Sequence, residues 1–336
     1  MEIIEEVGIN CSYAPPELIA AAGYLPRRLW PEGIGGKARE VLPVNYCPYS
    51  RAILSEIYDD DSKVILASSC DAMRRVYDIK YDSGFLLEVP RRNSPQFVNF
   101  FVRKLEETRN FLGGFNNLQE KIIIYNQCRE LMKELRDNLL DNNGYSFALL
   151  VGALYHYYNH DQEWLQKLVD RTAVVPGTGN GGVKKPGVVI SSSCLLDTTL
   201  IDLMEEVGFR IMGLDSCLGE RAFDFSVQTE GNNLLLNLAE SYLKKPACPR
   251  MLESEKRLAY IRHLISRRNA EGLIYFIPKF CDQASYDFKY LKEWAIETDF
   301  PMLMVEGEYR SGESGQLKTR IEAFRESLQL QLGFEV

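Results

Sequence analysis

The chain has 336 residues, of which 46% are hydrophobic and 26% charged, a balance typical of a soluble globular protein that is long enough to form two domains. Its formal net charge of −8 and the lack of a basic block with interleaved aromatic residues argue against a nucleic-acid-binding surface. The acidic N-terminus, MEIIEEVGINCSY, has no signal-peptide core, and no apolar run approaches the roughly 20 residues that a membrane span needs, so we expect a cytoplasmic protein with neither nucleic acid nor membrane as a partner.

The first 90 residues alternate short apolar runs with helical patterns. Residues 15–23, PPELIAAAG, predict a helix that begins at proline and ends at glycine. Strands are predicted in YLPRRLW (24–30), KVILASS (63–69) and GFLLEVP (84–90), and helices in CPYSRAILSEIYD (47–59) and CDAMRRVYDIKYD (70–82). This alternation of strand and helix favours a parallel sheet.

The middle of the chain has a different pattern. Residues 94–172 carry three apolar-periodic stretches, which predict a helical excursion within an N-terminal α/β domain of residues 1–172. Residues 173–187, AVVPGTGNGGVKKPG, are rich in glycine and proline and predict a linker. The alternation of strand and helix then returns, so we expect a C-terminal α/β domain over residues 188–336.

The second half repeats the architecture of the first. Strands are predicted in GVVISSS (187–193), FRIMGLDS (209–216), GLIYFIPKF (272–280) and FPMLMVEGE (300–308). Helices are predicted in LDTTLIDLMEEVG (196–208), CPRMLESEKRLAYIRHLISRRN (248–269), SYDFKYLKEWAIETD (285–299) and SGQLKTRIEAFRESLQLQL (314–332). The expected fold is therefore α/β, with two Rossmann- or flavodoxin-like parallel-sheet domains and an inserted helical segment.

Three cysteines lie where predicted helices begin: Cys47, Cys70 and Cys281. Turns from strand to helix converge at the carboxyl ends of a parallel sheet, so these thiols are expected to meet. A helix N-terminus favours the thiolate, which is the form that binds metal. Three thiolates would hold three irons of a [4Fe-4S] cube and leave one iron open, whereas the plainer interpretation of each is a buried structural cysteine. No C-x-x-C pair occurs, which excludes ferredoxin and zinc-ribbon signatures.

Two further groups are candidates for binding. Cys194, Cys217 and Cys248 follow or precede predicted elements and form a second possible metal set, although local packing explains them at least as well. Near the C-terminus, a Ser/Gly turn opens the last predicted helix, whose free N–H groups could hold an anion or the sulfides of a cluster. Its residues are Ser311, Ser314, Gly315 and Gln316, and a polar turn with serine N-caps is the alternative.

Several segments in a fixed order resemble the 2-hydroxyacyl-CoA dehydratase and benzoyl-CoA reductase family, and in particular the D-component of 2-hydroxyglutaryl-CoA dehydratase. The similarity runs from residue 9 to about residue 328. It rests on INCSYAPPELIAAAGYLPRRLW, NYCPYSRAIL, SSCDAMRRVYD, SCLGER, KFCDQASYDFKYLKE and FPMLMVEGEYRSGESGQLKTRIEAF.

The resemblance implies an oxygen-sensitive lyase of anaerobic metabolism. It implies two α/β domains with a [4Fe-4S] cluster between them, held by Cys47, Cys70 and Cys281. It also implies a dimer, with a related second subunit or with itself, and a separate ATP-dependent iron–sulfur activator that delivers single electrons. In that chemistry an electron enters the thioester carbonyl of a 2-hydroxyacyl-CoA, and the resulting ketyl radical expels hydroxide. No residue indicates a particular acyl group or a catalytic side chain.

Two alternatives stay open within the resemblance. One branch of the family carries a double-cubane [8Fe-9S] cluster and reduces small molecules as a homodimer driven by an ATP-dependent reductase. Cys194, Cys217 and Cys248 would supply the number of extra ligands that such a cluster needs. The other alternative is a non-catalytic protein that uses the fold to hold a cluster for electron transfer.

Overall fold

Two four-stranded sheets, each with all its strands parallel, form the framework of the described residues. The computed structural model describes residues 4–141, 144–173 and 185–333. The N-terminal sheet contains β1 (Glu6–Ile9), β2 (Leu25–Arg28), β3 (Val64–Ala67) and β4 (Gly84–Leu87). The C-terminal sheet contains β5 (Gly187–Ser192), β6 (Arg210–Asp215), β7 (Gly272–Pro278) and β8 (Met302–Gly307). The predicted α/β class with two parallel-sheet domains is confirmed.

The two sheets share one topology. Their strand orders are β2-β1-β3-β4 and β6-β5-β7-β8, so in each sheet the first strand lies between the second and the third. Every residue of β3, β5 and β7 is buried, as expected for parallel strands covered on both faces. The second strand lies on one side of the first strand and the third strand lies on the other side. This reversal of strand order places a ligand-binding crevice at the carboxyl ends of the first and third strands.

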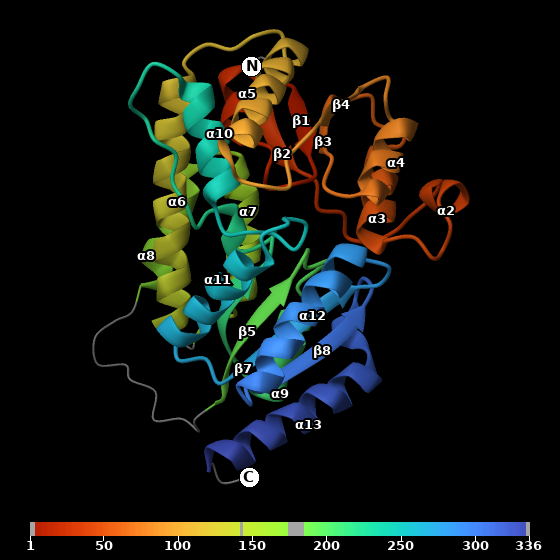
Figure 1. Cartoon of the computed structure of the whole chain (residues 1–336), viewed down its shortest axis with the longest axis vertical. Helices are drawn as coiled ribbons and strands as arrows, with labels where there is room; N and C mark the ends of the chain where they lie inside the picture. Colours follow the sequence, from red (N-terminus) through yellow and green to blue (C-terminus); the bar gives the residue numbers. More distant parts are fainter. Residues whose placement is uncertain (1–3, 142–143, 174–184, 334–336) are drawn as a thin grey trace.

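Helices cover the sheets and fill the middle of the chain. Figure 1 shows the N-terminal sheet above the C-terminal sheet, the helices α6, α7, α8 and α10 upright along one flank, and α13 across the base. The helices are α1 (Pro16–Ala21), α2 (Ala38–Val41), α3 (Pro48–Ile57), α4 (Asp71–Ile79), α5 (Pro95–Phe111), α6 (Leu118–Asp141), α7 (Ala148–Tyr158), α8 (Gln162–Thr172), α9 (Thr199–Val207), α10 (Leu234–Lys244), α11 (Ser254–Arg267), α12 (Asp282–Glu297) and α13 (Gly315–Leu332).

Helix α6 joins the two halves. Asn126 Nδ2 donates to the carbonyl of Val227 at 2.7 Å, and Arg136 Nη1 lies 3.1 Å from Asp224 Oδ1. These contacts attach the helical excursion to residues that precede α10, so the excursion packs against both halves and not only against the domain in which the sequence placed it.

The third apolar stretch of the helical excursion contains two helices. It forms α7 and α8, with a break at His160, whose φ is +47°. Asp161 begins the second helix, because its side chain accepts a hydrogen bond from the backbone N–H of Trp164 at 3.1 Å. The local cap therefore overrides an apolar pattern that continues through the turn.

Other boundaries also differ from the predictions. The predicted helix 248–269 begins only at Ser254, so Cys248 lies in a turn before α11. Cys47 follows a loop, not a strand, because the short helix α2 stands between β2 and that loop. Strand β1 and helix α10 were not predicted.

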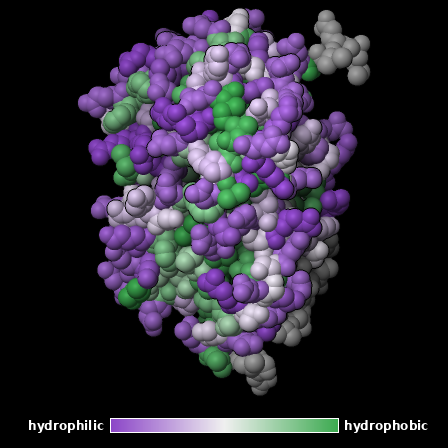
Figure 2. Space-filling model, turned by 90° about the vertical axis from the view of Figure 1, so that its right-hand side faces the viewer, coloured by the Kyte–Doolittle hydropathy of each residue, from purple (hydrophilic) through white to green (hydrophobic). Residues whose placement is uncertain are grey.

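The surface carries mixed character. Figure 2 shows a mostly hydrophilic face with a broken band of apolar side chains running down it. Among the described residues, no helix combines the length and the hydropathy that crossing a bilayer demands.

Most of the predicted linker 173–187 falls on residues 174–184, which lie outside the described residues. The proposed domain boundaries stay a prediction.

Candidate functional site

The three cysteines predicted to meet line one pocket. Cys47, Cys70 and Cys281 share a cavity of about 690 Å³, in which the first two come from the N-terminal half and the third from the turn between β7 and α12. Cys70 and Cys281 each follow the third strand of their sheet, at the crevice that the shared topology provides. The structure brings these side chains together, and their role as metal ligands remains a prediction.

Each of these cysteines is the N-cap of a helix. Cys47, Cys70 and Cys281 precede the first residues of α3, α4 and α12. No side-chain capping hydrogen bond forms, but backbone N–H groups of the first turn that follows act to lower the pKa of each thiol. They belong to Tyr49 and Ser50 for Cys47, to Ala72 and Met73 for Cys70, and to Gln283 and Ala284 for Cys281. Three helix N-termini therefore direct N–H groups toward one pocket, an arrangement that stabilises negative charge on sulfur.

Burial nevertheless dominates the protonation of these thiols. Loss of water contact, with a smaller contribution from the neighbouring Cys281, raises the pKa of Cys47 to about 12. Burial likewise raises the pKa of Cys70 to about 11 and raises the pKa of Cys281. The N–H groups at the helix N-terminus favour the thiolate of Cys70, as expected, but burial penalises the charge more than these groups stabilise it. Binding of a metal would instead displace the proton.

A second group of cysteines lies beside the first. Cys194 and Cys217 hydrogen-bond to each other, and Cys248 lies close enough to Cys217 for their charges to interact. Cys194 and Cys217 are buried, and Cys248 is partly buried. The structure thus assembles the second candidate set and adds Cys11, which interacts with Cys248 and which the sequence pattern did not indicate. Cys11 follows β1 as Cys194 follows β5, a correspondence that only the shared strand order reveals.

Buried cations surround this second group. Arg28 Nη2 donates to Cys217 Sγ at 3.6 Å, and the charges of Arg221 and Lys245 also reach Cys217. The hydrogen bond from Cys194 and these cations lower the pKa of Cys217 against the effect of burial. Lys245 Nζ donates to Ser12 Oγ at 3.0 Å. Sequence reasoning missed Arg28 and Lys245, since only the fold carries them to the cysteines.

One buried hydroxyl beside the cysteines lacks a hydrogen-bond partner. The Tyr309 hydroxyl is buried without a hydrogen-bond partner, and its neighbours include Cys47 and Cys194. A buried hydroxyl without a partner indicates a place for a further group. Within residues 4–141, 144–173 and 185–333, no three His, Cys, Asp or Glu side chains gather tightly enough to hold a single metal ion. Ligands at separate corners of an iron–sulfur cluster need no such close contact, so three cysteines that line one pocket are compatible with such a cluster.

The rest of the pocket lining is mixed and includes cations, carboxylates and aromatic rings. The cations are Arg74, Arg91, Arg92 and Arg250, the carboxylates are Asp71, Glu88 and Asp282, and the aromatic residues are Phe97, Phe100, Phe280 and Tyr286. Arg250 is buried and donates to the carbonyls of Val89 at 2.8 Å and of Pro90 at 3.1 Å, so it fixes the wall itself. Arg91 and Arg92 are exposed and remain accessible to a ligand. The four guanidinium groups outnumber the three carboxylates, so this lining suits an anionic ligand with an apolar portion.

The C-terminal turn does not line the pocket. Ser311, Ser314, Gly315 and Gln316 are absent from its lining residues. Ser311 donates to the carbonyl of Glu308, and Ser314 is the N-cap of α13 without a side-chain capping bond. Tyr309, which precedes this turn, interacts with Cys47 and Cys194. The prediction that these four residues bind an anion stays a prediction.

Comparison with known proteins places the chain among enzyme subunits. Residues 11–328 match the family model for "2-hydroxyglutaryl-CoA dehydratase, D-component". The chain is 23% identical to the (R)-phenyllactyl-CoA dehydratase beta subunit of Clostridium sporogenes, over 98% of this chain and 93% of that protein. It is 25% identical to the lactoyl-CoA dehydratase beta subunit of Anaerotignum propionicum, over 96% and 91%. It is also 22% identical to one of the subunits of benzoyl-CoA reductase from Thauera aromatica, over 95% and 89%.

Proposed function

Because the chain belongs to the 2-hydroxyglutaryl-CoA dehydratase D-component family, we propose that it is the iron–sulfur subunit of an enzyme that removes water from a 2-hydroxyacyl-CoA. The observation that carries the proposal is that three cysteines distant in sequence line one pocket, each at a helix N-terminus. A [4Fe-4S] cluster in this place would supply single electrons to the thioester and an open iron as a Lewis acid.

The residues of this chain would hold the cluster and keep the pocket in shape. Cys47, Cys70 and Cys281 supply three thiolates, and the N–H groups of α3, α4 and α12 stabilise their charge. Gln283 Nε2 donates to the carbonyl of Ser69 at 2.6 Å, so the two ligand turns that carry Cys70 and Cys281 are linked directly. This link holds ligands from the two halves at a fixed separation.

The lining of the pocket supports an acyl-CoA as substrate. Exposed Arg91 and Arg92 offer guanidinium groups to the phosphates of coenzyme A, whereas Arg74 lies 3.9 Å from the carboxylate of Glu88. Phe97 and Phe100 give the acyl chain an apolar wall. Dehydration near the cluster requires exclusion of water, and an aromatic lining serves that purpose.

The proposed partners follow from the same family. The relatives named above are all subunits of larger enzymes, and we expect this chain to pair with a related subunit or with a second copy of itself. An ATP-dependent iron–sulfur activator would deliver the electrons, in the cytoplasm and without oxygen.

The second cysteine group favours one other function. If Cys194, Cys217 and Cys248 also bind iron, the chain carries a double-cubane [8Fe-9S] cluster and acts as a homodimeric reductase of small molecules. The proximity of these thiols, and the buried cations Arg28 and Lys245 that offset their charge, support this alternative.

The two functions differ in a direct assay. The anaerobic protein is mixed with an ATP-driven one-electron donor and a panel of 2-hydroxyacyl-CoA thioesters, together with the related subunit if one is encoded nearby. Formation of the 2-enoyl-CoA supports the dehydratase. Reduction of azide or acetylene without conversion of any thioester supports the reductase and contradicts the first proposal.

A further inference from the structure

Ser193 contacts one of the three pocket cysteines directly. It follows β5 in the C-terminal sheet, and its Oγ lies 3.3 Å from Cys281 Sγ. As a metal ligand Cys281 is a thiolate, which has no proton to give, so in that state the Ser193 hydroxyl must be the donor. Neither the sequence pattern nor the family resemblance singled out this residue.

A buried arginine fixes the backbone of Ser193. Arg221 Nη2 donates to the carbonyl of Ser193 at 2.8 Å and also to the carbonyl of Ser192. The other arm of the guanidinium, Nη1, donates to Asp215 Oδ1 at 2.6 Å and to the Asp215 carbonyl at 2.9 Å. Arg221 and Asp215 are both buried, so these bonds form away from competing water.

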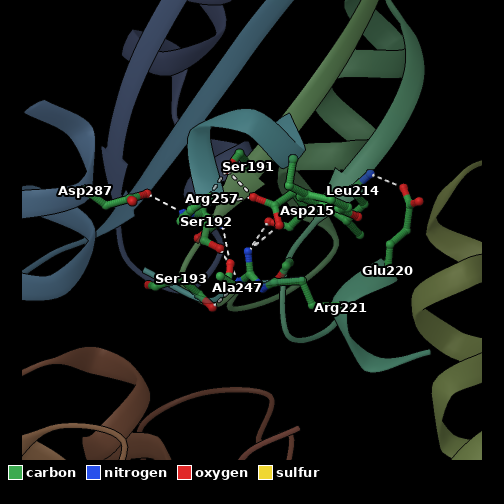
Figure 3. A network of polar contacts seen from close by, with 12 residues as sticks. Ser191, Ser192, Ser193, Leu214, Asp215, Glu220, Arg221, Ala247, Arg257 and Asp287 are labelled. Atoms are coloured by element: carbon green, nitrogen blue, oxygen red, sulfur yellow. Dashed lines mark hydrogen bonds and ion pairs between the residues drawn. The ribbon is translucent and has the colours of Figure 1, made fainter. Parts of the chain in front are cut away.

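The same network returns to the helix that begins after Cys281. Asp215 Oδ2 lies 2.9 Å from Arg257 Nη2, and Arg257 Nε donates to Asp287 Oδ2 at 2.7 Å. Asp287 belongs to α12, whose N-cap is Cys281. The contacts therefore form a closed ring. It runs from Cys281 through α12 and three ion pairs to Arg221, then to Ser193 and back to the sulfur. Figure 3 shows Ser193, Arg221, Asp215, Arg257 and Asp287 in this arrangement.

We propose that Ser193 is a positioning residue that donates a hydrogen bond to the Cys281 sulfur and thereby raises the reduction potential of the bound cluster. The inference rests on the proposed ligation by Cys281. A hydrogen bond withdraws electron density from a ligating thiolate and stabilises the more reduced cluster, so it shifts the potential in the positive direction. The ring of buried ion pairs keeps donor and acceptor in contact through the redox cycle.

The test is a redox titration of the cluster-loaded chain, prepared without oxygen. Ser193→Ala removes the donor, and we expect iron and sulfide contents equal to wild type with a more negative midpoint potential. Ser193→Thr and Ser193→Val form a pair of nearly equal shape that differs in the hydroxyl, and the threonine variant should have the higher potential. Ser285→Ala is the matched control, because Ser285 Oγ donates to the backbone carbonyl of Cys281 at 3.0 Å and not to its sulfur. Its potential should equal that of wild type.

The outcomes separate this inference from the function on which it rests. Equal potentials in wild type and Ser193→Ala, with full iron content in both, overturn the role of Ser193 and leave the cluster in place. If the alanine variant does not load iron, equal potentials in the threonine and valine variants overturn the inference. Wild-type protein without iron overturns the proposed function together with the inference.

Discussion

At the residue scale, the position of a cysteine and not its sequence neighbourhood separates the pocket thiols from the others. Cys128 lies in α6, is fully buried and does not line the pocket, although burial raises its pKa to about 12 as it does for Cys47. A raised thiol pKa therefore reports burial and carries no information about metal binding. Geometry distinguishes Cys70, because helix N–H groups and two further thiols face its sulfur.

This difference gives a prediction for paired serine variants. Cys70→Ser removes one of three proposed ligands and should abolish most of the bound iron and lower the thermal stability of the anaerobic protein, because metal binding is coupled to folding. Cys128→Ser, at a buried site without a place in the pocket, should keep the iron content of wild type. Iron content and the visible absorption of the cluster measure both. Iron retained in the first variant, or lost in the second, shows that the ligands have been misassigned.

Lys245 gives a second prediction at this scale. Burial is the main cause that lowers its pKa to about 7, from an ordinary value near 10.5 in the unfolded chain. Between these two pH values the unfolded state binds more protons at this residue, so the contribution of Lys245 to folding stability rises as the pH rises from about 7 to about 10.5. Below pH 7 the lysine is charged in both states and its contribution no longer changes.

Comparison of wild type with a variant at two pH values separates the contribution of Lys245 from those of the tyrosines and thiols that also titrate at high pH. Urea unfolding of the metal-free protein is measured for wild type and Lys245→Met at pH 7 and pH 9. We expect the stability of wild type to increase relative to the methionine variant at the higher pH. A stability difference independent of pH means that Lys245 keeps its proton in the fold.

At the element scale, the sequence predicted strands better than helices. Of the eight strands in the described part of the chain, all but β1 fall within predicted strands. The buried strands β3, β5 and β7 were evident because strands covered on both faces are mostly apolar. Strand β1 was missed since it begins at the charged Glu6 beside an acidic terminus. The break between α7 and α8 was missed because tyrosines and a tryptophan continue the apolar pattern through His160.

The candidate site could also be predicted only in part. Cys47, Cys70 and Cys281 could be found because thiols that precede predicted helices follow a rule of topology. Ser193, Arg28 and Lys245 could not be found, since their roles depend on contacts between segments that only the tertiary structure brings together. Long-range ion pairs such as the one between Arg257 and Asp215 leave no periodic signal either.

A buried ion pair between α1 and α6 provides the prediction at this scale. Glu17 on α1 pairs with Arg129 on α6 and accepts a hydrogen bond from the Tyr242 hydroxyl of α10 at 2.7 Å, and all three side chains are buried. Glu17→Gln leaves the guanidinium without its counter-charge and should cost about 3–5 kcal/mol of unfolding free energy.

The matched control is an exposed ion pair on α8, another helix of the same excursion. Glu163 and Lys167 pair along α8 at the surface, and Glu163→Gln should leave stability unchanged within error. Denaturant unfolding of both variants, at equal cluster content, measures the difference. Similar stabilities for the two variants would contradict the assigned importance of the buried pair.

At the scale of the whole molecule, the pocket exists only where the two halves meet. Arg250 reaches the carbonyls of Val89 and Pro90 in the N-terminal half, and Lys245 reaches Ser12. The two sheets share one strand order, so the crevices at their carboxyl ends correspond and place cysteines of both halves around a common centre. The proposed cluster would therefore hold the two halves together, and its loss would weaken their contact.

The most direct test of this account counts iron and acid-labile sulfide per chain in protein purified without oxygen. Two triple serine variants accompany wild type: one at Cys47, Cys70 and Cys281, and the other at Cys194, Cys217 and Cys248. We predict about four irons and four sulfides in wild type, none in the first variant and a full set in the second. About eight irons in wild type, with partial loss in the second variant, would favour the double-cubane reductase. Iron that survives replacement of Cys47, Cys70 and Cys281 would contradict the central claim that these residues hold the cluster.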